Sequence, residues 1–161
     1  VDAQHRTSVR NLYAAGECCA QYHGANRLGG NSLLGAIYGG KIAAQTALAE
    51  ADGSAHTCQI TQAGVQTPMQ EQQLLHRALL DGLGVVRTQE SMERALHTVQ
   101  SLSGNLALLG QAVLRSALAR RESRGAQFRT DYPETEHKYC AAAVAHYQQG
   151  NLSITWGDVT I

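Results

Sequence analysis

Three apolar stripes in the second half of the chain constrain its fold most strongly. In each stripe apolar residues recur every three or four positions, which is the pattern of a helix with one buried face. The connections between stripes, residues 84–88 and 101–105, are short, so consecutive helices must be antiparallel neighbours. The sequence therefore predicts a mainly α-helical protein built on a three-helix bundle that is similar to a spectrin repeat. The stripes are Leu74, Leu75, Ala78, Leu79 and Leu83; Met92, Ala95, Leu96 and Val99; and Leu106, Leu109, Val113, Leu114, Ala117 and Leu118.

The chain after the third stripe is less regular. Tyr132-Pro133 interrupts the helical pattern. A short alanine-rich helix is expected from about residue 136 to 147. The alternating run from Leu152 to Trp156 is typical of an edge strand and predicts a small C-terminal β element.

The first 52 residues predict a strand, a loop and a helix. Residues 9–16 combine a short apolar run with a closing glycine, which suits a buried strand. A glycine-rich loop follows. Apolar residues then recur at helical spacing from Leu33 to Leu48, with Asn31 or Ser32 available as the N-cap, so the start of this helix points into the loop.

Composition divides the chain near its middle. Residues 53–67 are rich in Gly, Ser, Thr and Gln and poor in apolar side chains, as in a linker. Pro68 then stands where the start of a helix tolerates proline. We expect three parts: residues 1–52, a linker at residues 53–67, and a helical domain at residues 68–161.

Charge and cysteine content exclude several classes of function. The 161 residues contain 13 Lys and Arg against 13 Asp and Glu, so no basic field attracts nucleic acid or an anionic membrane. No apolar run reaches the roughly 20 residues of a membrane span. Cys18, Cys19, Cys58 and Cys140 form no CxxC pair and no spacing with histidine, which argues against a zinc site and favours reduced thiols in a cytosolic protein.

The loop before the first helix carries the candidate chemistry. It contains His23 and Arg27 among glycines, next to backbone N–H groups and the positive end of the helix dipole. That arrangement suits an anion or an electron-rich group of a ligand. Glycine-rich loops also occur at helix starts for packing alone, so the residues by themselves leave both interpretations open.

Two motifs carry a resemblance to a known family. LYAAGE at residues 12–17, followed by HGANRLGGNSLL at residues 23–34, resembles the last FAD-binding segment of the succinate dehydrogenase and fumarate reductase flavoproteins, a family that includes L-aspartate oxidase. ALARRESRGAQFRTDYP at residues 117–133 resembles the C-terminal helical domain of the same family. The two motifs frame nearly the whole chain.

The resemblance implies a role for each residue of the first motif. Glu17 matches a glutamate that binds FAD, and Ser32 and Leu33 match positions that touch the flavin through the start of the helix. Arg27 matches the arginine that grips a carboxylate of the dicarboxylate substrate, and His23 begins the same motif close to the substrate. A planar guanidinium suits this role because it can form two parallel hydrogen bonds to one carboxylate.

The implied activity is an FAD-dependent oxidoreduction that interconverts fumarate and succinate by hydride transfer. The family's GxGxxG motif and capping domain, which carries the proton-shuttling arginine, are expected upstream, as is any catalytic acid or base. We therefore expect FAD in the full-length parent only, and a colourless, inactive fragment. An iron–sulfur subunit of an electron-transport complex is an expected partner, and the expected location is cytoplasmic, with membrane association only through partner subunits.

Two alternatives stand beside this function. One is a fragment of L-aspartate oxidase or a related FAD-dependent acid oxidoreductase, although Gly29-Gly30 stands where aspartate oxidases more often have Ala-Ser. The other is a non-catalytic helical interaction module that retains the loop as a vestige.

Two positions depart from the family pattern, since Gly35 replaces an acidic residue and Gln127 replaces a histidine.

The charged residues of the second motif are expected to be structural. Their opposite charges could tie the third helix of the bundle to the loop that follows or to the flavin domain. They are Glu122, Arg124, Arg129 and Asp131.

Overall fold

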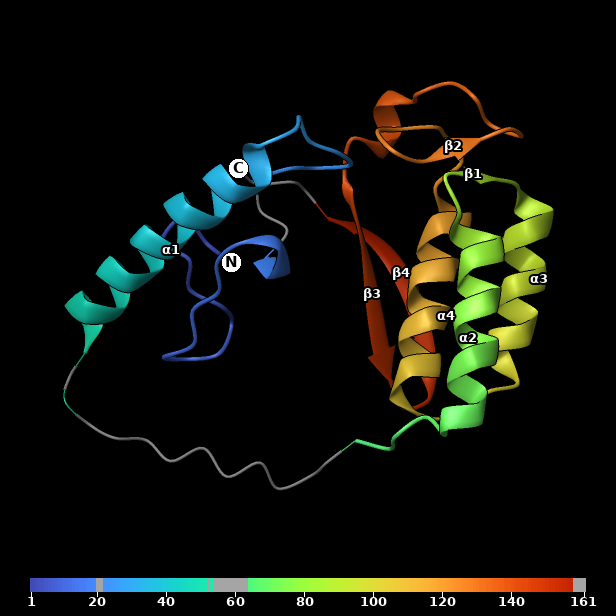
Figure 1. Ribbon diagram of the computed structural model, residues 1–161, viewed down its shortest axis with the longest axis horizontal. Coiled ribbons are helices and arrows are strands. Elements are labelled where there is room, and N and C mark those ends of the chain that lie inside the picture. The colour runs from blue at the N-terminus through green and yellow to red at the C-terminus, as the bar shows by residue number, and fades with distance from the viewer. Residues whose placement is uncertain (20–21, 52, 54–63, 158–161) are drawn as a thin grey trace. The chain divides into compact units, whose positions relative to one another are not determined.

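The computed structural model describes residues 1–19, 22–51, 53 and 64–157, and these form two compact units (Figure 1). The described residues up to Gly53 make the N-terminal unit, and those from Gly64 onward make the helical unit. Most of the expected linker at residues 53–67 lies outside the described residues. As predicted, the protein is mainly α-helical, with a few short strands.

The N-terminal unit contains a short 3-10 helix, η1 (Glu17–Cys19), and one long helix, α1 (Asn31–Glu50). The strand predicted at residues 9–16 is not formed, and Tyr13 makes only an isolated antiparallel bridge with Arg6. Asn11 has a φ of 63°, which turns the backbone out of the extended region. The segment is a turn folded back on the first residues of the chain.

Helix α1 starts differently from the prediction. Neither Asn31 nor Ser32 caps it; the N-cap is Gly30, whose φ of 86° suits glycine, and no side chain bonds the first turn. Gly39 is the buried position of the helix, because the ring of His5 packs against it. A Cβ atom at Gly39 would lie 2.6 Å from His5 Cε1. Most large apolar side chains of α1 are exposed, namely Leu33, Leu34, Ile37, Tyr38 and Leu48.

The other end of α1 is tied to the same N-terminal turn. Glu50 accepts hydrogen bonds from the guanidinium of Arg6 and from the hydroxyl of Tyr13, the latter at 2.6 Å. Arg6 also pairs with Asp2 at 3.1 Å. The hydrogen bonds from Arg6 and Tyr13 lower the pKa of Glu50. This network keeps the turn against the last turn of α1.

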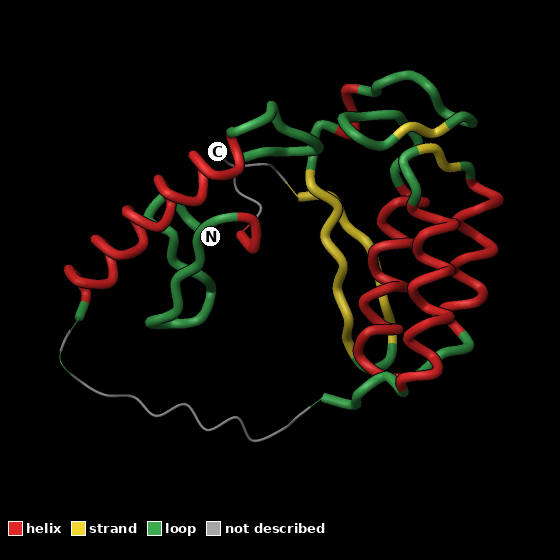
Figure 2. The backbone as a smooth tube through the Cα atoms, in the orientation of Figure 1, coloured by secondary structure: helices red, strands yellow, loops and turns green. Residues whose placement is uncertain are grey.

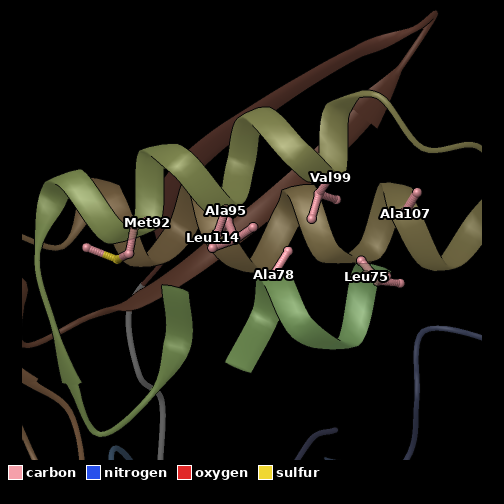
Figure 3. Close-up of a cluster of buried hydrophobic side chains, with 7 residues drawn as sticks. All are labelled: Leu75, Ala78, Met92, Ala95, Val99, Ala107 and Leu114. Atoms are coloured by element: carbon pink, nitrogen blue, oxygen red, sulfur yellow. The ribbon is translucent and has the colours of Figure 1, made fainter. Parts of the chain in front are cut away.

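The helical unit contains α2 (Met69–Leu83), α3 (Gln89–Gln100) and α4 (Gly104–Ala119), which pack against one another. The helices cover the three apolar stripes predicted from the sequence. Figure 3 shows the buried side chains that the helices share between them. Gly82 and Gly110 allow close approach, since added Cβ atoms would lie 2.5 Å from Ala95 Cβ and 2.9 Å from Leu75 Cδ1. The buried core comprises Leu75, Ala78, Met92, Ala95, Val99, Ala107 and Leu114.

A short parallel sheet joins the turn after α2 to the segment after α4. Strand β1 (Val86–Arg87) pairs with β2 (Phe128–Arg129), with Val86 opposite Phe128. Thr88 then caps α3 in a capping box with Ser91. The second sequence motif is thereby held beside the α2–α3 connection.

The helix predicted at residues 136–147 is wrong. Only η2 (His137–Tyr139) is helical, and β3 (Ala142–Gln148) pairs with β4 (Asn151–Gly157) in an antiparallel hairpin (Figure 2). The strand predicted from Leu152 to Trp156 is confirmed as part of β4. The turn residues Gln149 and Gly150 have φ of 50° and 82°, and two positive φ values are what a tight two-residue hairpin requires. Both strands contact α4.

Within the described ranges, no helix is long and apolar enough to cross a membrane.

Candidate functional site

The glycine-rich loop leads from η1 into α1 and is open on its outer side. Gly24 and Gly30 have φ of 54° and 86°, values that glycine adopts without a Cβ penalty. Among the described residues, a Cβ atom added at Gly24, Gly29 or Gly30 would meet no atom within 4 Å. A ligand could therefore approach the backbone of this loop closely.

Two predicted cofactor positions lie in the first turn of α1. The backbone N–H groups of Ser32 and Leu33 have no acceptor in the part of the chain that the structure describes. They lie at the positive end of the helix dipole, where an acceptor or a negative charge is stabilised. The Leu33 side chain is 67% exposed.

The third predicted cofactor residue, Glu17, is the first residue of η1. Its carboxylate is exposed and has no hydrogen bond or ion pair with the residues described. It is therefore available to accept hydrogen bonds from hydroxyl groups of a ligand.

Arg27 is exposed in the middle of the loop. Its backbone N–H donates to Asn26 Oδ1 at 2.8 Å, and its Nη1 donates to the carbonyl oxygen of Leu28 at 3.4 Å. No carboxylate in residues 1–19, 22–51 or 64–157 pairs with it. Most of its donors remain available for an anion.

His23 lies against the second turn of α1. A Cβ atom at Gly35 would be 3.2 Å from His23 Nε2, so the missing side chain at this departure from the family pattern makes room for the imidazole. His23 borders a cavity of about 400 Å³ together with Tyr22, Asn31, Leu34, Gly35 and Tyr38. Of the predicted site residues, His23 is therefore brought against the helix that carries Ser32 and Leu33.

The structure adds a pair that the sequence analysis missed. His5 is fully buried; its Nδ1 lies 2.7 Å from the carbonyl oxygen of Ala14 and its Nε2 lies 2.5 Å from the hydroxyl of Tyr22. Because a carbonyl can only accept, Nδ1 carries the hydrogen, and in a neutral imidazole Nε2 is then the acceptor for the Tyr22 hydroxyl. Burial raises the pKa of Tyr22. This bond fixes the Tyr22 ring, which meets His23 edge-on at 6.3 Å between centroids.

Glu122 is the centre of the second motif. Its side chain is fully buried and accepts hydrogen bonds from Arg120 Nη1 at 2.6 Å, Arg124 Nε at 2.8 Å and the backbone N–H of Glu136 at 2.8 Å. Burial alone would raise the pKa of Glu122, but the hydrogen bonds from Arg124, Glu136 and Arg120 outweigh it and lower the pKa to about 2. Glu122 is therefore an ionised structural anchor.

Arg129 closes the C-terminal end of α4. Its Nη1 donates to the carbonyl oxygens of Leu118 at 3.2 Å and Arg120 at 2.9 Å, groups that have no partner inside a helix. Asp131 pairs with the same guanidinium and holds it in place. These contacts support the structural role expected for this motif.

No group of three or more His, Cys, Asp or Glu side chains in the described ranges is placed to hold a metal ion.

Two family models match the chain. Residues 1–33 match a FAD binding domain, and residues 103–161 match the fumarate reductase flavoprotein C-terminal domain. Together the two matches cover more than half of the residues. The chain therefore belongs to the fumarate reductase and succinate dehydrogenase flavoprotein family, whose members are FAD-dependent oxidoreductases.

Two curated relatives of the chain carry different names. The chain is 33% identical over 142 residues to L-aspartate oxidase of Pyrococcus furiosus, a match that covers 86% of the chain and 30% of the relative. It is 30% identical over 176 residues to one subunit of the CoM/CoB fumarate reductase of Methanothermobacter marburgensis, covering 86% of the chain and 32% of the relative. The chain thus spans about a third of the length of these two relatives.

Solved structures agree on the fold. A quinol–fumarate reductase with menaquinol molecules matches with a TM-score of 0.80 at 23% identity, over 99% of this chain and 36% of that one. The Sdh1 complex of Mycobacterium smegmatis in its apo form matches with a TM-score of 0.65 at 24% identity, over 91% of this chain and 32% of that one. At this identity the likeness defines the fold alone.

Proposed function

We propose that this chain is the C-terminal part of a flavoprotein that interconverts fumarate and succinate by hydride transfer at FAD. The observation that carries the proposal is Arg27, an exposed guanidinium in an open glycine loop that has no carboxylate partner among the described residues. We interpret the helical unit as a three-helix bundle with an added hairpin.

The residues around the loop fit a flavin. The free N–H groups of Ser32 and Leu33 would donate to acceptor atoms of the ring system, and the α1 dipole would favour negative charge there. The exposed Glu17 carboxylate would accept hydrogen bonds from hydroxyl groups of the cofactor. When bound, FAD supplies the hydride acceptor or donor.

Arg27 would orient the dicarboxylate. Two parallel N–H···O bonds to one carboxylate fix both its position and its plane, which aligns the carbon that exchanges the hydride. His23, seated on Gly35, would border the substrate. The proton donor, the pyrophosphate site and the capping domain would come from the N-terminal part of the protein, and electrons from an iron–sulfur partner in the cytoplasm.

Reconstitution tests this proposal. The 161-residue chain is expected to show no flavin absorption band and no activity alone. Mixed with the separately expressed N-terminal portion and FAD, it is expected to restore fumarate reduction by reduced viologen. Arg27→Ala should abolish the restored activity, whereas Arg10→Ala, which removes another exposed arginine of the same unit, should leave it unchanged. If the N-terminal portion is folded but the mixture shows no fumarate reduction, the result would contradict the proposal and favour a helical interaction module.

L-aspartate oxidation is the second candidate. The observation in its favour is the identity to L-aspartate oxidases, which reaches 36% over 145 residues for the enzyme of Pyrococcus horikoshii. Against it stands Gly29-Gly30 in place of the more usual Ala-Ser. The same reconstituted protein discriminates, because an aspartate oxidase produces hydrogen peroxide from L-aspartate and oxygen, whereas our first proposal predicts no turnover of L-aspartate.

A further inference from the structure

The helical unit contains a second cavity, of about 300 Å³, with two arginines in its wall. Arg87 of β1 and Arg120 after α4 line it together with Gln127. Its apolar wall includes Leu83 and Val113. A cavity of this size is at the lower end of the range for small-molecule sites.

Among the described residues, Arg87 forms hydrogen bonds only with neutral groups. Its Nε donates to the carbonyl oxygen of Gly84 at 2.9 Å, its Nη2 to that of Leu83 at 3.0 Å, and its Nη1 to Gln127 Oε1 at 3.3 Å. A guanidinium has five N–H donors, so one on each terminal nitrogen has no acceptor in the described part of the chain. This side chain can still form two hydrogen bonds.

The carboxylates nearby are already engaged. Glu122 is shared between Arg120 and Arg124, and Asp131 pairs with Arg129. The charged residues around the cavity therefore carry an excess of positive charge, because two carboxylates stand against four guanidinium groups: Arg87, Arg120, Arg124 and Arg129. Burial and the neighbouring charge of Arg129 lower the pKa of Arg87, which means that the ionised guanidinium lacks compensation in this cavity.

We propose that this cavity binds a carboxylate on a short apolar stem. The carboxylate would take the two open N–H donors of Arg87 and meet the positive field of Arg120, and the stem would lie against Leu83 and Val113. The neutral side chain of Gln127 is decisive, because a glutamate at this position would place a carboxylate of the chain itself beside Arg87. Either a free carboxylic acid or the side chain of an acidic residue from another polypeptide segment has this chemistry.

Titration with butyrate tests the proposal on the full chain. We expect saturable shifts of the Arg87 Nε–H and Gln127 side-chain amide resonances, and about tenfold weaker binding of butyramide, which has the same shape without the charge. Gln127→Glu is expected to weaken butyrate binding by about tenfold or more. Gln73→Glu, at an exposed position on α2, adds the same net charge outside the cavity and should leave binding unchanged.

Three results of the titration would overturn the proposal. Butyramide binding as tightly as butyrate, a non-saturating shift, or equal butyrate affinity in wild type and the Gln127→Glu variant would each overturn the proposal. The Arg87→Gln variant is a second test of butyrate binding. Because this substitution removes hydrogen bonds to the end of α2, the fold of the variant is first checked by circular dichroism. A parallel titration with N-acetyl-glutamate amide separates the sources, since binding as tight as that of butyrate supports a polypeptide carboxylate and much weaker binding supports a free acid.

Discussion

Replacing Glu122 by glutamine preserves the shape of the side chain and removes the charge that Arg120 and Arg124 share. The glutamine also presents an NH₂ group to donors where the carboxylate offered a second acceptor oxygen. Since the side chain is fully buried, water cannot replace the lost partner. We expect a large loss of stability in the helical unit.

The magnitude follows from the pKa. The pKa of Glu122 falls from its ordinary value of 4.5 to about 2 in the folded protein. This lowering of the pKa corresponds to about 3 kcal/mol of stabilisation at neutral pH. Breaking one partner out of a buried ion pair costs a similar amount, about 3–5 kcal/mol. Because the folded pKa is the lower one, the contribution is complete above the unfolded value and is lost as the pH falls from about 4.5 to about 2.

Urea denaturation followed by Trp156 fluorescence measures this loss. Trp156 is the only tryptophan of the chain and lies in β4, with Arg120 Cζ 4.9 Å from its ring centroid, so it reports on the helical unit. The variant is expected to lose about 3 kcal/mol at pH 7 and progressively less as the pH approaches 2. Glu134→Gln, which neutralises an exposed carboxylate on the same loop, should change stability by less than about 0.5 kcal/mol.

Two results would refute the reasoning. A loss below about 1 kcal/mol at pH 7 would mean that Glu122 contributes no more than an ordinary hydrogen bond. A penalty that stays constant between pH 7 and pH 2 would mean that the cost arises from packing, since only the charge titrates.

Two glycine substitutions test the packing of each unit. Gly82→Ala would place a Cβ atom 2.5 Å from Ala95 Cβ in the core and is expected to destabilise the helical unit by about 1–3 kcal/mol in the same urea assay; an unchanged midpoint would contradict the close approach. Gly39→Ala should displace His5 and break its hydrogen bonds to Ala14 and Tyr22. Loss of the Nδ1–H···Ala14 bond would be seen as loss of the distinct His5 Nδ1–H resonance by NMR. Gly40→Ala, where a Cβ meets nothing within 4 Å, is the matched control and should leave that resonance in place.

The helices of the helical unit could be predicted because each has an apolar face of the right period and short connections. The error at residues 136–147 has a physical cause. Alanine is the best helix former but is also tolerated in a strand, and pairing with β4 decided the outcome. The signal that could have revealed the hairpin is Gln149-Gly150, a glycine-containing pair between two runs of alternating residues.

The roles of the candidate site residues come from the family resemblance and stay predictions. The placement of Arg27 in a loop and of Ser32 at the start of a helix could be predicted from local patterns, whereas the contacts that support this region could not. The pairing of His5 with Tyr22 joins residues 17 positions apart and depends on how the first turn folds under α1, which no periodicity encodes. A glycine inside a helix, such as Gly39, was the available hint that another group approaches closely.

The cap that Arg129 provides has a consequence for the order of events during synthesis. The last carbonyl groups of α4 receive their donor from a residue that is made after the helix itself, on a strand that must first find β1, some forty positions earlier. A nascent chain that has released α4 but not Arg129 therefore holds a helix with an open end. The C-terminal end of α4 therefore cannot receive this cap until the segment that follows the helix has been made and has paired with β1.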